Sequence, residues 1–164
     1  MKLININDYD ICNYKKPAMF IIFPYCSFKC DYECGQDVCQ NSALAKENII
    51  ELSSTDIIYR YLFNPLTHAI VCGGLEPFDT FEDLKELITE FRDICEDPII
   101  IYTGYYENEI QKELNQLIEI NQNSALPGAL IVKFGRFIPN MPHRYDEVLG
   151  VELASDNQYA KIWG

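Results

Sequence analysis

The chain has 164 residues, of which 48% are hydrophobic, and a formal net charge of −12. This length and composition predict a single domain over residues 1–164 with its own core. The negative charge argues against nucleic-acid binding, which needs lysine and arginine to replace phosphate counterions. No secretory signal and no run of about 20 apolar residues is found, so we expect a cytoplasmic protein without a membrane partner.

Buried strands and amphipathic helices are expected to alternate along the chain. In chain order we predict a strand at Ala18–Tyr25, a helix from about 53 to 63, a strand at His68–Cys72, a helix from about 79 to 95, a strand at Pro98–Thr103, a helix from about 107 to 120, and strands at Leu130–Phe134 and Tyr159–Trp163. Continuous apolar strands that alternate with helices are typical of an α/β fold with a parallel sheet covered on at least one face.

The unusual residues of the sequence follow these strands. A cysteine-rich loop begins at Cys26, Gly73-Gly74 follows the second strand, Gly104 the third and Gly135 the fourth. In parallel α/β sheets ligands bind at the carboxyl ends of the strands, and glycine lets the backbone approach a ligand closely. We therefore expect one site at this edge of the sheet.

Four of the seven cysteines lie close together, at Cys26, Cys30, Cys34 and Cys39, with three, three and four intervening residues. In a reducing compartment such thiols are expected to be metal ligands and not disulfides. Soft sulfur ligands suit an iron–sulfur cluster or zinc. A four-cysteine zinc site is the alternative, although such sites usually separate two short-spaced pairs by a longer segment. Cys72 and Cys95 fit positions in the hydrophobic core.

The segments FPYCSFKC at Phe23–Cys30 and CQN at Cys39–Asn41 resemble the two ends of the radical S-adenosylmethionine signature. That signature has three cysteines, the second three residues after the first and the third two residues after the second. The resemblance implies a [4Fe–4S] cluster, S-adenosylmethionine as cofactor, and a fold of mostly parallel strands in a partial (β/α) barrel. Three thiolates leave one iron open for the amino and carboxylate groups of S-adenosylmethionine.

The sequence departs from this signature between Cys30 and Cys39, where eight residues intervene and Cys34 lies among them. The resemblance favours Cys26, Cys30 and Cys39 as cluster ligands, because Gln40-Asn41 follows Cys39 as it would the third ligand. Cys34 stays open as a bystander, a substitute ligand or a fourth ligand that would close the site.

Further motifs extend the resemblance to about the C-terminus. Gly73-Gly74-Leu75-Glu76-Pro77 resembles the family's glycine-glycine-glutamate-proline segment, with Leu75 inserted. By analogy its backbone and Glu76 would receive the methionyl ammonium group. The resemblance also implies cofactor contacts by Asn41, by Thr103 to the nucleoside and by Arg136 to the carboxylate, although a helix-capping or ion-pair role for Arg136 is equally open. No catalytic residue is expected beyond the cluster ligands.

The late segments Ile101–Tyr105, Gly135-Arg136-Phe137 and Ser155–Gln158 resemble activators of the anaerobic ribonucleotide reductase. In place of an aspartate before glycine-arginine, this chain has Lys133-Phe134. The resemblance implies reductive cleavage of S-adenosylmethionine to a 5′-deoxyadenosyl radical, which would install a glycyl radical on the anaerobic ribonucleoside-triphosphate reductase. A low-potential electron donor such as a flavodoxin would be a second partner. Two alternatives stay open: a radical enzyme with a peptide or small-molecule substrate, and a non-catalytic iron–sulfur or zinc protein.

Overall fold

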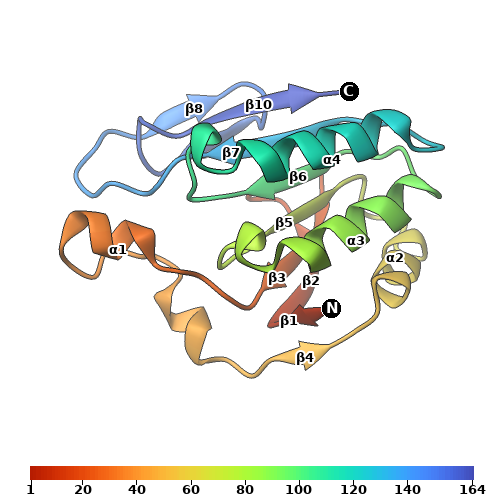
Figure 1. The fold of residues 1–164 in the computed structure, drawn as a ribbon, viewed down its shortest axis with the longest axis horizontal. Helices are drawn as coiled ribbons and strands as arrows, with labels where there is room; N and C mark the ends of the chain where they lie inside the picture. Colours follow the sequence, from red (N-terminus) through yellow and green to blue (C-terminus); the bar gives the residue numbers. More distant parts are fainter.

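A mixed six-stranded sheet forms the centre of the computed structural model, which describes residues 1–164 (Figure 1). Its strand order is β10-β7-β6-β5-β3-β2. The strands of this sheet are β2 (Asn5–Asp10), β3 (Ala18–Phe23), β5 (Ile70–Gly74), β6 (Ile99–Tyr102), β7 (Leu130–Phe134) and β10 (Tyr159–Trp163). The four strands β3, β5, β6 and β7 are parallel, and the edge strands β2 and β10 are each antiparallel to their neighbours. The sheet is therefore open at both edges.

The predicted strands are found within about two residues of their expected bounds. The sheet does not close into a complete barrel, because β2 and β10 do not pair with each other, and the partial (β/α) barrel stays a prediction. The continuous apolar sequence of β3 and β7 is explained by their position inside the sheet, where residues on both faces are covered.

Three helices cover one face of the sheet: α2 (Ser54–Leu62), α3 (Phe81–Arg92) and α4 (Gln111–Asn123) (Figure 1). Short 3-10 turns precede two of them, η2 (Pro77–Thr80) before α3 and η3 (Glu107–Glu109) before α4. The helices bury their apolar stripes, such as Ile57, Leu84 and Leu114, against the sheet residues Ile21 and Ile101. This layer is the main hydrophobic core.

The opposite face of the sheet has a smaller core and carries the cavity described below. Tyr14 from the β2–β3 connection packs there with Leu149 and Leu153 from the β8–β9 segment. That segment is a hairpin of β8 (Arg144–Asp146) and β9 (Val151–Leu153), which the sequence analysis did not predict. The sheet is thus covered by helices on one face and by loops and a hairpin on the other.

Five other elements were not predicted. The N-terminal segment contributes the edge strand β2, and β1 (Lys2–Leu3) pairs with β4 (Ile50–Glu51). The cysteine-rich loop, expected to be irregular, contains the helix α1 (Lys29–Cys34), followed by the 3-10 turn η1 (Ser42–Lys46). Neither α1 nor η1 has a buried residue. The cysteine segment therefore lies on the surface of the α/β core.

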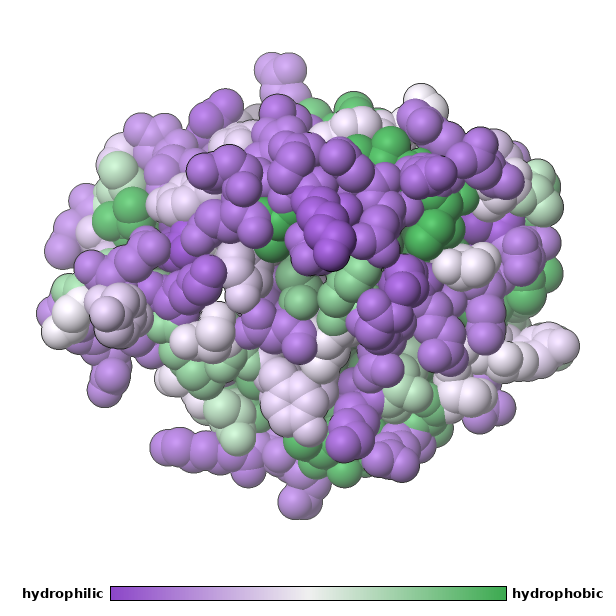
Figure 2. Space-filling model, viewed as in Figure 1, coloured by the Kyte–Doolittle hydropathy of each residue, from purple (hydrophilic) through white to green (hydrophobic).

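The molecular surface agrees with the acidic composition. The face drawn in Figure 2 is mostly hydrophilic, with apolar side chains in separate small areas. None of the helices combines the length and the apolar character that crossing a membrane would require.

Candidate iron–sulfur site

The cysteine segment leaves the carboxyl end of β3 in a tight conformation. Cys26 follows Pro24 and Tyr25, and the backbone N–H of Phe28 donates a hydrogen bond of 3.2 Å to the Cys26 sulfur. Phe28 has a φ of 51°, a left-handed conformation that costs a non-glycine residue roughly 1–2 kcal/mol. This residue starts helix α1, which carries Cys30 in its first turn. The local strain brings the Cys26 and Cys30 segments into one turn.

Asp31, next to Cys30, binds the backbone at Val38 and Cys39 and so brings the end of the intervening segment back toward Cys30. Its Oδ1 atom accepts hydrogen bonds from the backbone N–H groups of Val38 and Cys39, both at 2.7 Å. Residues 35–37 connect the end of helix α1 to Val38. The Asp31 carboxylate therefore holds the two ends of this eight-residue segment together. Cys39 lies at the site although its spacing from Cys30 departs from the radical signature.

Cys26, Cys30 and Cys39 line one cavity of about 450 Å³ at the carboxyl end of the parallel strands. Cys34 does not line it, although it lies on the same short helix as Cys30. The other walls include Asn41, Gly74, Glu76, Tyr102, Thr103, Gly104, Lys133 and Gln158. Three of the four clustered cysteines are therefore brought together, and they are the three that the resemblance favoured.

Without a metal ion, the three thiols of this cavity are less easily deprotonated than an exposed cysteine. Burial raises the pKa of Cys26 to about 12 and also raises the pKa values of Cys30 and Cys39. Cys39 further raises the pKa of each of the other two by charge repulsion, which reflects their proximity. Thiolates in such a place need a positive partner, and metal ions supply it.

Glu76 lies at the start of η2 and is 4% exposed. Its Oε1 atom accepts hydrogen bonds from the Thr103 hydroxyl at 2.8 Å and from the Phe78 N–H at 3.2 Å, and Oε2 accepts from the Gly104 N–H at 2.8 Å. Burial raises the pKa of Glu76 to about 7, although these three donors lower it. The carboxylate joins the ends of β5 and β6 and still borders the cavity.

Thr103 lines the cavity, and its expected contact with a nucleoside stays a prediction, but its hydroxyl already has partners within the protein. The Thr103 hydroxyl donates to Glu76, and it accepts a hydrogen bond of 3.0 Å from the Tyr105 N–H. Thr103 is 2% exposed, so its side chain is committed to the protein. Its observed role is to orient the Glu76 carboxylate.

The glycine pair at the end of β5 is required by packing. A Cβ atom on Gly73 would lie 2.9 Å from the ring of Phe20, and one on Gly74 would lie 2.5 Å from the Ile22 side chain. Gly74 also has a φ of 90°, which favours glycine. The Gly74 carbonyl accepts a hydrogen bond of 2.8 Å from the Asn41 side chain. Gly74 and Asn41 border the cavity, but Gly73 does not.

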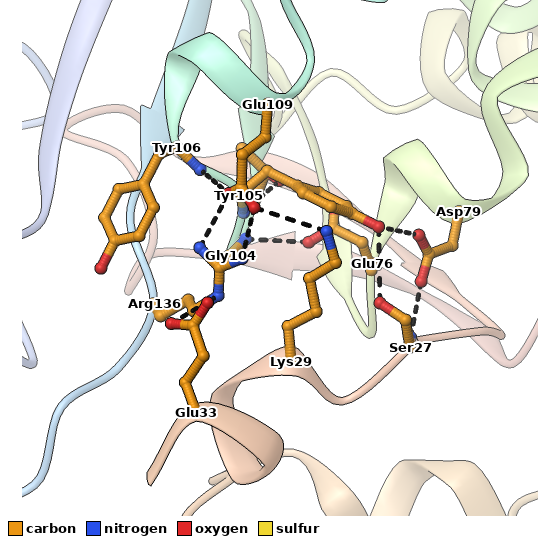
Figure 3. Close-up of polar contacts among 11 residues, drawn as sticks. Ser27, Lys29, Glu33, Glu76, Asp79, Gly104, Tyr105, Tyr106, Glu109 and Arg136 are labelled. Carbon is orange, nitrogen blue, oxygen red and sulfur yellow. Dashed lines mark hydrogen bonds and ion pairs between the residues drawn. The ribbon is translucent and has the colours of Figure 1, made fainter.

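Arg136 is held by two glutamates, as Figure 3 shows. Its guanidinium donates to both carboxylate oxygens of Glu109 at 2.8 and 2.6 Å, and its Nε lies 3.1 Å from a Glu33 oxygen. The guanidinium also lies 4.7 Å from the ring centre of Tyr106. Arg136 is 2% exposed and does not line the cysteine cavity itself, but it lines a small adjoining hollow together with Cys30 and Glu76. The structure therefore shows the ion-pair role of Arg136, and its contact with a cofactor carboxylate stays a prediction.

A second group of contacts fixes the start of the cysteine segment (Figure 3). Asp79 accepts hydrogen bonds from the Ser27 backbone N–H at 2.6 Å and from the Tyr105 hydroxyl at 2.5 Å. The Lys29 ammonium lies 4.4 Å from the ring centre of Tyr105. These contacts join the cysteine segment to the loops after β5 and β6.

The late motif around Ser155–Gln158 supports the loop after β7. The side-chain amide of Gln158 donates to the Gly135 carbonyl at 3.1 Å, and that of Asn157 donates to the Arg136 carbonyl at 2.8 Å. The motif therefore has a structural function in this chain, because it fixes the backbone that carries Arg136.

Comparison with known proteins agrees with the cysteine cavity. A family model described as a 4Fe-4S single cluster domain matches residues 18–144, which is most of the chain. The chain belongs to this family. Searches of curated proteins and of solved structures found no significant match.

The cavity fits the cluster of the 4Fe-4S single cluster domain family. In a [4Fe–4S] cluster each cysteine thiolate binds a separate iron, so its ligands surround a group of atoms and not one point. The three thiols share one cavity, their burial favours pairing with metal, and the N–H of Phe28 already points at one sulfur. No three histidine, cysteine, aspartate or glutamate side chains converge as ligands of a single metal ion would.

Most of the other cavity-lining residues were not predicted as part of the site, and Lys133 is the basic residue among them. Lys133 lies in β7 and is 7% exposed, and it lines the cavity together with the cysteines. Its signal in the sequence was a lysine inside an otherwise continuous apolar strand. Strand alternation directs Lys133 to the cavity face, while Phe134 joins the main core on the helix side.

Proposed function

We propose that this chain is a radical S-adenosylmethionine enzyme. The observation that carries the proposal is that three cysteines share one cavity while the fourth lies outside it. Three thiolates would bind three irons of a [4Fe–4S] cluster, and the fourth iron would have no protein ligand. Catalytic metal sites keep such an open position for a substrate or cofactor.

The residues around the cavity have defined parts in this proposal. Cys26, Cys30 and Cys39 would hold the cluster, and Asp31 fixes the return of Cys39. Glu76 would receive the ammonium group of the cofactor, because a carboxylate has about four acceptor positions and three are used here. The Gly74 carbonyl accepts one hydrogen bond from Asn41, so its second lone pair could accept from the same ammonium group.

Held by Cys26, Cys30 and Cys39, the cluster would supply one-electron reduction of the sulfonium, with the electron coming from a low-potential donor such as a flavodoxin. The products would be methionine and a 5′-deoxyadenosyl radical, which can remove a hydrogen atom from a glycine Cα. The protein supplies orientation and shielding for this chemistry. Phe20, Tyr102 and Leu153 line the cavity and would keep water from part of it.

We propose further that the substrate is a glycine of the anaerobic ribonucleoside-triphosphate reductase. The late segments that resemble activators of that reductase support this, and so does the open sheet, which leaves the cavity without the walls of a complete barrel (Figure 1). A large protein substrate could insert a loop there. A small-molecule substrate would need more enclosure.

The proposal is tested with protein purified without oxygen and reconstituted with iron and sulfide. With a chemical reductant and S-adenosylmethionine, we expect 5′-deoxyadenosine and methionine in equal amounts. With the reductase present, electron paramagnetic resonance should detect a glycyl radical on that partner. A cluster-loaded protein that forms no 5′-deoxyadenosine would contradict the radical function. Cofactor cleavage without a radical on the reductase would contradict only the choice of substrate.

A further inference from the structure

Lys133 is a buried cation without a carboxylate partner. Its Nζ atom donates one hydrogen bond, to the Gly135 carbonyl at 3.0 Å, and no carboxylate oxygen lies within 4.0 Å of it. An ammonium group has three donors, so two have no protein acceptor. A buried charge is costly unless it is paired and hydrogen-bonded. The unused donors therefore mark a place where an anion would be stabilised.

Because Lys133 borders the cysteine cavity, an anion that pairs with it would bind inside this cavity. Lys133 borders the same cavity as Cys30 and Glu76, and both groups act on its charge. Burial lowers the pKa of Lys133 to about 8, which still leaves most of the side chain protonated at neutral pH. The cavity thus combines a cation and, on Glu76, an anion with an unused acceptor position.

The other cation expected at this site is already engaged. Arg136 lines a small hollow beside the cavity together with Cys30 and Glu76, but it does not line the cavity itself and forms ion pairs with Glu109 and Glu33. Lys29 pairs weakly with Glu109, at 3.4 Å, and lies over Tyr105. Among the residues that line the cysteine cavity, Lys133 is the one lysine or arginine. A ligand with both an ammonium and a carboxylate group would find complementary partners in Glu76 and Lys133.

We propose that Lys133 binds the carboxylate of the amino-acid end of S-adenosylmethionine while Glu76 binds its ammonium group. This inference rests on the proposed radical function and assigns to Lys133 the contact that the sequence resemblance gave to Arg136. Lys133 is then a specificity residue for a zwitterionic cofactor. Lys133 is 7% exposed, so the ion pair would form at a buried ammonium group, where such pairs are stronger than at the surface.

The test compares two ligands that differ only in this carboxylate. Binding of S-adenosylmethionine and of its decarboxylated analogue to the anaerobic, cluster-loaded protein is measured by equilibrium dialysis without a reductant. The wild-type protein should prefer the carboxylated ligand by about ten-fold or more. Lys133→Met should lose this preference and bind the decarboxylated analogue about as tightly as wild type does. Lys112→Met, at an exposed lysine of α4, should keep the wild-type preference.

The outcomes separate the two proposals. If wild-type protein binds neither ligand, the radical function fails and this inference with it. If wild type shows the preference and Lys133→Met keeps it, only the role of Lys133 is wrong. Loss of the preference in Arg136→Gln but not in the Lys133 variant would return the contact to Arg136. Should Lys133→Met fail to fold, Lys133→Gln removes the charge and keeps a polar head, and the same loss of preference is expected.

Discussion

Glu76 shows how one buried side chain can organise a site. Its carboxylate accepts three hydrogen bonds from the ends of two neighbouring strands, so it fixes β5 relative to β6 at the cavity. The raised pKa means that the folded chain holds a proton there more firmly than the unfolded chain does. Linkage then makes the stability of the protein depend on pH.

We expect the metal-free protein to lose stability as the pH rises from about 5 to above 7. The pKa of Glu76 is raised from 4.5 to about 7, so its contribution is complete below 4.5 and is lost through pH 7, by up to roughly 3 kcal/mol. Glu76→Gln should flatten this slope in urea unfolding measured from pH 5 to 8. The exposed Glu119→Gln is the matched control, and an unchanged slope in Glu76→Gln would refute the assignment.

The ligand assignment is also a residue-scale prediction. Cys39→Ala should lose most of the iron and sulfide bound after anaerobic reconstitution, because it removes a thiol of the shared cavity. Cys34→Ala should keep both, because its thiol lies outside. Iron and sulfide counts with the visible absorption spectrum decide the matter. A cluster that survives in Cys39→Ala and is lost in Cys34→Ala would reverse the assignment.

At the scale of elements, helix α1 is attached to the fold by polar contacts. It has no buried residue, and Glu33 joins it to Arg136, which Glu109 in turn ties to η3. The Arg136 hydrogen bonds hold the pKa of Glu109 at about 2, well below its usual range. The ion pair is therefore present from pH 4.5 upward and weakens as the pH falls through 2.

Glu109→Gln should destabilise the protein by about 1–3 kcal/mol at pH 7, because the buried Arg136 charge loses its bidentate partner. The difference from wild type should shrink toward pH 2, where Glu109 becomes protonated. Glu33→Gln, at a half-exposed partner, should have a smaller effect. Chemical unfolding at several pH values measures these effects. Equal stability of wild type and Glu109→Gln at pH 7 would contradict this account of the ion pair.

The sequence predicted the four parallel strands, the three amphipathic helices and the C-terminal edge strand. β3 and β7 were evident as unbroken apolar runs. The helix expected from about residue 53 is α2, which Ser53 caps by accepting a hydrogen bond from the Asp56 N–H at 3.0 Å. The edge strand β2 was missed because its sequence NINDYD has one core position, Ile6, and depends on pairing with β3. Helix α1 was missed because it has no apolar face.

In the site, residue identities were easier to predict than their partners. The cysteines stood out by spacing alone, but the return of Cys39 depends on two backbone hydrogen bonds to Asp31 that no motif encodes. Arg136 was identified, yet its carboxylate partners lie far along the chain, at Glu33 and Glu109. Lys133 was noted only because it stands where related sequences were expected to have another residue before the glycine-arginine pair. Which face of the sheet its side chain lies on depends on the register of β7.

At the scale of the whole molecule, the six-stranded sheet joins the N-terminal and C-terminal segments in one layer. β2 and β10 are its two edges, and the parallel strands between them share the main core. We therefore continue to propose that residues 1–164 form one domain. Such a domain should unfold in a single cooperative step.

Trp163 provides a probe of this prediction. It lies in β10 with its ring against Phe134 of β7, at a centroid distance of 6.2 Å. Its fluorescence should report the same unfolding midpoint as far-ultraviolet circular dichroism, which follows the helices α2, α3 and α4. Two midpoints that differ beyond error would show that the C-terminal edge unfolds independently.

The surface position of α1 and η1 bears on how the protein matures. Because neither element has a buried residue, the hydrophobic scaffold can be complete before any metal arrives. Proteins whose core is built around a metal cannot fold without it, whereas here insertion would follow folding as a separate step. Oxidative loss of the cluster should accordingly leave a folded apoprotein that can be repaired in place by fresh iron and sulfide.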